Sequence, residues 1–130
     1  MSGYSYYNPH PTQRGIGDCV IRSLSKALDE TWEKIYLDLV VEGFFERDLP
    51  NSDIVWGKYL IKKGFYRKLI PDDGFGAYSV ENFADEHPNG TYILSMPGKH
   101  VVTVVDSVIY DTWDSRNEIP SYYWSRKENE

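Results

Sequence analysis

The stretch "QRGIGDCVIRSLSKAL", residues 13–28, passes from a glycine-containing loop into apolar residues at helical spacing. That spacing predicts a helix near 18–29, with Asp18 placed to cap its start. Cys19, the only cysteine among the 130 residues, therefore lies at a helix start. The unpaired N–H groups and partial positive charge there stabilise a thiolate and lower the thiol pKa. The segment therefore leaves two roles open for Cys19. It is either a nucleophile or a small buried apolar side chain, which is the usual state of a free cysteine.

The rest of the first half has the pattern of further helices. Residues 1–12 are aromatic and proline-containing, and we expect an extended arm there. Helices are expected at 31–43, 52–64 and 79–87, the first two ending at Gly43 and Gly64, with a short strand at 65–70.

From Thr91 onward the pattern changes to short apolar runs. We expect successive strands at 91–96, 99–106 and 108–113. Helices followed by a meander predict an α+β fold, with a mainly helical part, 18–87, packed on one face of an antiparallel sheet part, 91–126. A chain of this length is expected to form one domain, 1–130.

Composition excludes several classes of protein. One cysteine forms neither an internal disulfide nor a multi-cysteine zinc site, and it suits a reducing cytosol. With a net charge of −6, general attraction to nucleic acid is not expected. Residues 1–13 lack the pattern of a signal peptide, and no apolar run has membrane-spanning length. We therefore expect a cytoplasmic protein without membrane contact, metal or organic cofactor.

Two further side chains would suit a reaction at Cys19. His100 heads the apolar run "VVTVV", so its imidazole can face a cleft and take the thiol proton; the alternative is a solvated strand end. Gln13, six positions before Cys19, can donate to a developing oxyanion together with the Cys19 backbone N–H, or be an ordinary loop residue. His10 and His87 are expected at the surface or as capping residues.

The hairpin around Asp106 decides which acid accompanies His100. A two-residue loop, 106–107, places Asp111 opposite Val102 and on the face of His100. A three-residue loop would instead place Asp114 opposite His100. Two-residue loops are common, so we expect Asp111 to hold the imidazole tautomer.

These residues, in the order Gln, Cys, His, Asp, resemble those of papain-like cysteine peptidases. "QRGIGDCVIRSLSKAL" and "KHVVTVVDSVIYDTW" resemble the Gln-to-Cys and His-to-Asp blocks of bacteriocin-processing peptidases, a papain-fold branch. "DTW" stands where papain has Asn-Ser-Trp. The resemblance implies a papain-like fold with Gln13 as oxyanion donor, Cys19 as nucleophile, His100 as base, Asp111 as orienting acid and Trp113 as hydrophobic shield. Val20 departs from it, since the peptidases usually have Gly or Ser after the nucleophile.

The chain also resembles small uncharacterised proteins of bacteriophages and Firmicutes, which carry "GDCVxRxLSKAL" and "YDTWDS". We therefore expect a thiol hydrolase or acyltransferase that acts on proteins or peptides in a bacterial or phage-infected cell. One alternative is a binding or inhibitor protein on the same scaffold, using the arm 1–12, the basic segment 58–68 or the tail 119–130. A cell-wall amidase or endopeptidase is a third. The sequence does not decide the oligomeric state.

Overall fold

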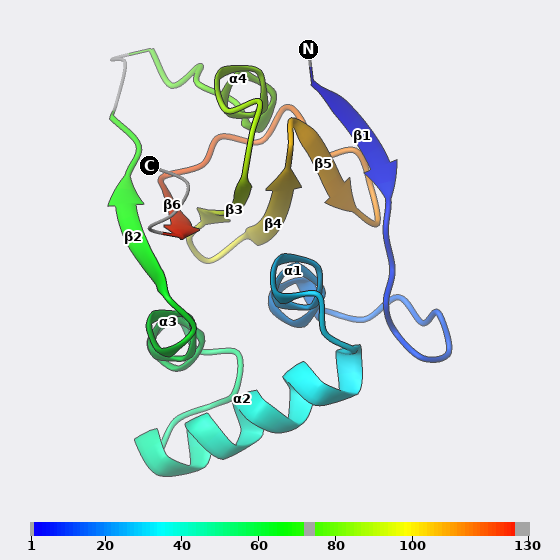
Figure 1. The fold of residues 1–130 in the computed structure, drawn as a ribbon, viewed down its shortest axis with the longest axis vertical. Helices are drawn as coiled ribbons and strands as arrows, with labels where there is room; N and C mark the ends of the chain where they lie inside the picture. Colours follow the sequence, from blue (N-terminus) through cyan, green and yellow to red (C-terminus); the bar gives the residue numbers. More distant parts are fainter. Residues whose placement is uncertain (1, 72–74, 127–130) are drawn as a thin grey trace.

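The computed structural model describes residues 2–71 and 75–126, which form four helices and a six-stranded mixed sheet (Figure 1). The helices are α1 (Cys19–Leu28), α2 (Trp32–Glu46), α3 (Asp53–Lys62) and α4 (Val80–Glu86). The strands are β1 (Gly3–Tyr6), β2 (Phe65–Leu69), β3 (Thr91–Met96), β4 (His100–Val105), β5 (Val108–Asp111) and β6 (Tyr122–Arg126), arranged in the order β1-β5-β4-β3-β6-β2. The predicted α+β class is confirmed.

The β4–β5 hairpin has the predicted two-residue loop. Asp106 and Ser107 both have positive φ, as in the type I′ turns that join tightly twisted strands. Val105 pairs with Val108, and Thr103 with Tyr110. This register confirms the expected alignment and brings Asp111 to the end of the sheet at which β4 begins.

Two strands lie outside the predicted meander. The arm forms β1, which pairs in parallel with β5 and covers its edge, and the aromatic segment of the tail forms β6 between β3 and β2. Neither segment has a clear period-two pattern, so only its long-range partners define it as a strand. Residues 127–130 of the predicted tail surface lie outside the described residues.

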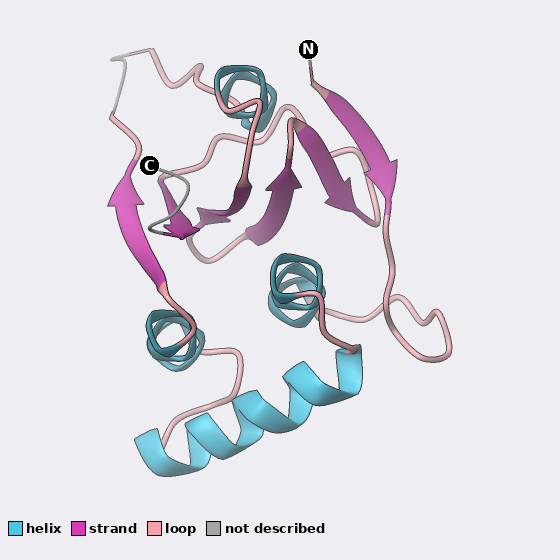
Figure 2. Ribbon diagram, viewed as in Figure 1, coloured by secondary structure: helices cyan, strands magenta, loops and turns pink. Residues whose placement is uncertain are grey.

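Helices cover both faces of the sheet (Figure 2). The expectation that all helices pack on one face is therefore wrong. Helices α1, α2 and α3 enclose a core with Leu24, Trp56 and Trp124, whereas α4 packs on the other face through Phe83. None of the described helices combines the length and hydrophobicity needed to cross a membrane.

Helix α2 runs past Gly43, its predicted end, and the chain reverses at Arg47 in the left-handed region. Gly43 is instead a point of close approach. A Cβ on it would lie 2.8 Å from the Asp48 carbonyl oxygen and 3.3 Å from the Pro50 nitrogen. The glycine therefore lets the connection to α3 fold back against the helix.

We expect Gly43→Ala to destabilise the protein by about 1–3 kcal/mol, because backbone must shift to admit the methyl group. This loss is net of the gain of about 1 kcal/mol that alanine brings to a helix interior relative to glycine. Gly3→Ala is the matched control, since a Cβ there meets nothing within 4 Å. Urea unfolding measures both; a Gly43→Ala protein more stable than the wild type would contradict the packing described.

Candidate active site

Two reciprocal hydrogen bonds tie α1 to β4. The Ser23 hydroxyl donates to the Val101 carbonyl oxygen over 3.0 Å, and the Thr103 hydroxyl donates to the Ser23 carbonyl oxygen over 2.7 Å. Ser23 lies one helical turn after Cys19, and Val101 directly follows His100. The clamp therefore brings the start of the helix to the start of the strand, where Cys19 and His100 share a hydrogen bond.

The imidazole of His100 also contacts Asp111. Its Nε2 lies 2.5 Å from Asp111 Oδ2, which leaves Nδ1 as the ring nitrogen available to the thiol. The Trp113 ring lies 5.0 Å from the imidazole, centroid to centroid, and is 45% exposed. Trp113 therefore packs beside the imidazole while part of its own ring stays exposed, which is compatible with the shielding role that the papain resemblance implies.

Asp111 is the acid that the structure places beside His100. Its side chain is 2% exposed, and besides the imidazole it accepts hydrogen bonds from the Ser115 hydroxyl at 2.7 Å and the Thr112 N–H at 2.8 Å. Asp114 is exposed and pairs with Arg116 instead. The even hairpin loop explains this choice between the two acids.

Arg22, which the sequence did not single out, lies between two buried carboxylates. Its Nη2 donates to Asp111 Oδ1 over 3.2 Å, and its Nη1 pairs with Asp18, whose Oδ2 also accepts from the Trp32 indole N–H over 2.9 Å. The i, i+4 spacing of Asp18 and Arg22 is a signal in the sequence for the first of these ion pairs. No local pattern indicates the contact of Arg22 with Asp111. Together the contacts of Arg22 and Asp18 link α1 and α2 to the acid beside His100.

Asp18 occupies the N-cap position, but its carboxylate makes no cap hydrogen bond, so the predicted capping role is wrong. The guanidinium of Arg22 and the indole of Trp32 bind it more strongly than the helix N–H groups would. Its negative charge is therefore balanced by Arg22, and the first-turn N–H groups of α1 have no side-chain cap.

Gln13 lies in the loop before α1, and its amide contacts that loop. Its Nε2 donates to the carbonyl oxygens of Asn8 at 3.0 Å and His10 at 3.1 Å. The structure thus does not bring the Gln13 amide to Cys19 as it brings His100 and Asp111 together.

The two other histidines differ in their surroundings. His10 is buried against Trp32, with the two rings edge-on at 4.8 Å, so the expected surface position is wrong for it; its Nδ1 accepts from the Thr12 N–H at 3.1 Å, which fits the expected alternative of a capping residue. His87 ends α4, where its Nδ1 lies 2.8 Å from the Phe83 carbonyl oxygen.

Electrostatics favour a charged pair at Cys19 and His100. Burial raises the pKa of the Cys19 thiol, but the hydrogen bond and charge of His100, a hydrogen bond with the Val101 backbone and the charge of Arg22 together lower it. Burial lowers the pKa of His100, yet Asp111 and Cys19 together raise it to about 9. Burial also raises the pKa of Asp111, but the contacts with His100 and Ser115 hold it below its usual value. The lowered pKa of Cys19, the raised pKa of His100 and the lowered pKa of Asp111 all favour the charged form of each group.

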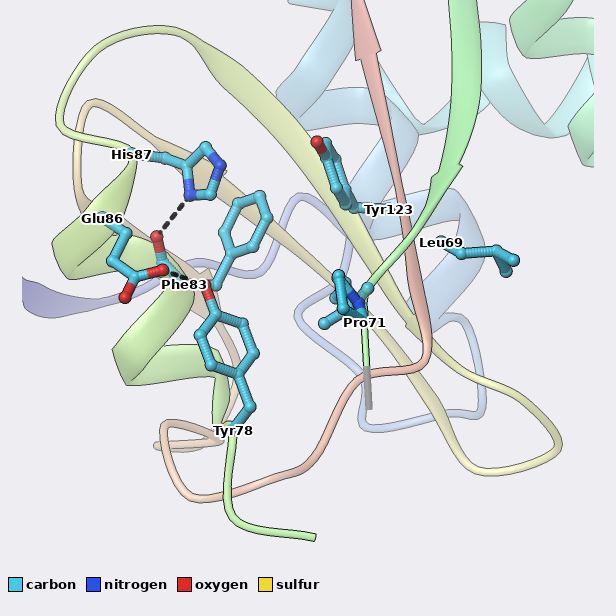
Figure 3. A pocket seen from close by; sticks show the side chains of 8 residues that line it. Leu69, Pro71, Tyr78, Phe83, Glu86, His87 and Tyr123 are labelled. Carbon is cyan, nitrogen blue, oxygen red and sulfur yellow. Dashed lines mark hydrogen bonds between the residues drawn. The ribbon is translucent and has the colours of Figure 1, made fainter. Parts of the chain in front are cut away.

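An aromatic hollow of about 440 Å³ lies apart from these residues (Figure 3). Tyr78, Phe83, His87 and Tyr123 line it, and the Tyr78 hydroxyl donates to Glu86 over 2.6 Å. Within residues 2–71 and 75–126, no group of three or more His, Cys, Asp or Glu side chains is placed to hold a metal ion. The hollow has ionisable side chains of its own, Tyr78, Glu86 and His87, but none of its lining residues belongs to the group around Cys19.

No protein-family model, curated protein or solved structure matches the chain. The chemistry of the site therefore rests on its own geometry.

Arg22→Gln is expected to destabilise the protein by about 3–5 kcal/mol, because it leaves two buried carboxylates without their shared cation. Adding Asp18→Asn should restore part of the loss, since one of those charges is then removed. Arg116→Gln, which breaks exposed pairs with Asp114 and Glu81, should change stability little. Chemical unfolding of the four proteins distinguishes these cases; equal losses for Arg22→Gln and Arg116→Gln would refute the buried network.

Asp111→Asn is expected to raise the pKa of the Cys19 thiol, because the neutral amide no longer stabilises the imidazolium that pairs with the thiolate. Each unit of increase reduces the thiolate fraction, and thus alkylation below the pKa, about tenfold. Asp114→Asn is the control and should leave the pKa of Cys19 unchanged. Iodoacetamide kinetics against pH measure this, and the opposite ranking of the two variants would contradict the register.

Proposed function

We propose that this protein is a papain-like thiol hydrolase in which Cys19 attacks a carbonyl carbon of a protein or peptide substrate. The observation that carries the proposal is the hydrogen-bonded chain from the Cys19 thiol through His100 to the buried Asp111. A nucleophile, a base within hydrogen-bond reach and a third group that orients the base form the arrangement used in covalent acyl transfer.

In the first half-reaction the Cys19 thiolate forms a bond to the carbonyl carbon, and the carbonyl π electrons move to oxygen. The uncapped N–H groups at the start of α1 would stabilise that oxyanion. Gln13 can join them only by releasing its contacts with Asn8 and His10. As the oxyanion collapses, the bond to the leaving group breaks, and the His100 imidazolium protonates that group.

In the second half-reaction neutral His100 takes a proton from water, whose oxygen attacks the thioester carbon. The carbon–sulfur bond then breaks and regenerates the Cys19 thiolate beside the imidazolium. Asp111 orients the ring and stabilises its charged form throughout. An amine acceptor in place of water would make the same residues an acyltransferase.

A binding protein on the same scaffold is the second candidate. A hollow of about 710 Å³ lies beside α3 and β2, and the basic side chains of Lys58 and Arg67 line it together with Tyr66 and Trp124. Part of its lining comes from the predicted basic segment 58–68, which suits an acidic peptide, although Asp53 lines it too. Either function is compatible with the cytoplasm of a bacterial or phage-infected cell, and we propose that the protein acts there.

The experiment that tests hydrolysis is intact-mass analysis during turnover of a peptide thioester. We expect the wild-type mass to rise transiently by one acyl group, and no adduct on Cys19→Ser. His100→Gln should acylate at least about a hundredfold more slowly, which is the usual contribution of a general base. Circular dichroism of each variant verifies folding. A wild type that never acylates across thioesters, isopeptides and peptide amides would leave the binding role as the better account.

A further inference from the structure

The outward face of α2 is apolar along its length. Leu37, Val41 and Phe44 follow one another at spacings of four and three residues, with Val40 and Phe45 on either side, and all five are exposed. The opposite face packs against the core through Ile35 and Leu39. Figure 1 shows α2 at the outside of the molecule, with α1 and α3 on its inner side. The helix thus has apolar residues on both its inner and its outer side.

The apolar area of this face is large for a monomeric protein. With Leu49, which follows the helix and is also exposed, these side chains present roughly 600 Å² of apolar surface, the upper end for the largest patch on a monomer. A stable interface buries about 800 Å² on each partner, including its polar rim. The α2 face and its rim therefore supply the area that a stable interface needs.

Charge and spacing favour a second copy of the chain as the occupant. In an antiparallel pair of α2 helices with the two-fold axis at Val41, Leu37 of one helix faces Phe45 of the other. The start of the helix carries Glu33 and Lys34 on this face, and its end is followed by Arg47 and Asp48. The same arrangement brings Lys34 of one chain toward Asp48 of the other, and Glu33 toward Arg47. Within its own chain Lys34 also pairs with Asp38, and Asp48 accepts from the Ser52 hydroxyl.

We propose that the protein forms a two-fold symmetric homodimer through the outer face of α2. Burial of this face removes its apolar side chains from water, and the antiparallel arrangement opposes the two helix dipoles. The contact lies on α2, away from Cys19, so dimer formation does not depend on the proposed hydrolysis.

Sedimentation analysis of the full chain at about 50 μM tests the proposal, because an interface of this size can hold at micromolar concentration. We expect a dimer for the wild type and a monomer for Leu37→Glu. Ile61→Glu is the matched control: Ile61 is also helical and apolar, and both side chains are 61% exposed. The control should remain dimeric. A monomeric wild type, or equal behaviour of the two glutamate variants, overturns the proposal.

A cross-link tests the geometry without destabilising the helix. In a Cys19→Ser background, Val41→Cys places a thiol near the proposed axis, and mild oxidation should convert most of the protein to a disulfide-linked dimer. Ile61→Cys in the same background should cross-link at least about tenfold more slowly, since a disulfide needs Cα atoms within about 7 Å. Equal cross-linking rates for the two positions would exclude the antiparallel α2 interface.

Discussion

The carboxylate of Asp111 must be satisfied inside the protein, and the groups that satisfy it join three parts of the fold. His100 contacts it from the start of β4, Arg22 from α1, and Ser115 from the segment after β5. An unpaired buried carboxylate is costly, so each of these contacts helps to hold its own segment in place. The Tyr7 N–H bonds to the backbone carbonyl oxygen of Asp111 over 2.8 Å, which also ties the N-terminal arm to the site.

Short contacts connect the carboxylate of Asp111 to the thiol of Cys19 through the imidazole of His100. The carboxylate favours the imidazolium form of His100, and the imidazolium in turn favours the thiolate of Cys19. The Ser23–Thr103 clamp makes this possible, because it fixes the two elements on which the thiol and the imidazole lie. Arg22 balances Asp18 as well as Asp111, which reduces the repulsion between the Asp18 carboxylate and a thiolate at Cys19. The hydrogen bonds of Ser23 and Thr103 and the charges of the buried side chains thus act on the same two residues, Cys19 and His100.

The sequence predicts the features of this site that depend on local pattern. Apolar periodicity places Cys19 at a helix start, and two residues with turn chemistry at 106–107 set the register that selects Asp111 over Asp114. It does not predict that Arg22 meets Asp111, since 89 positions separate them and only the tertiary fold brings them together. The local pattern at Asp18 is misleading for a similar reason, because a buried guanidinium and indole compete with the helix N–H groups for its carboxylate. Strand β1 is likewise defined by its distant partner β5.

The most direct test of the charged pair is a titration of the thiolate by ultraviolet absorbance, with Cys19→Ser as the blank for the tyrosines and other chromophores. The lowered pKa of Cys19 and the raised pKa of His100 predict that thiolate absorbance appears at a lower pH in the wild type than it does for an ordinary thiol. In His100→Gln the absorbance should appear only at the higher pH of an ordinary thiol, about 8.5 or above because the site is partly buried. If the wild type and His100→Gln titrate together at that higher pH, the thiol is not paired with the imidazole, and Cys19 is an ordinary, partly buried cysteine.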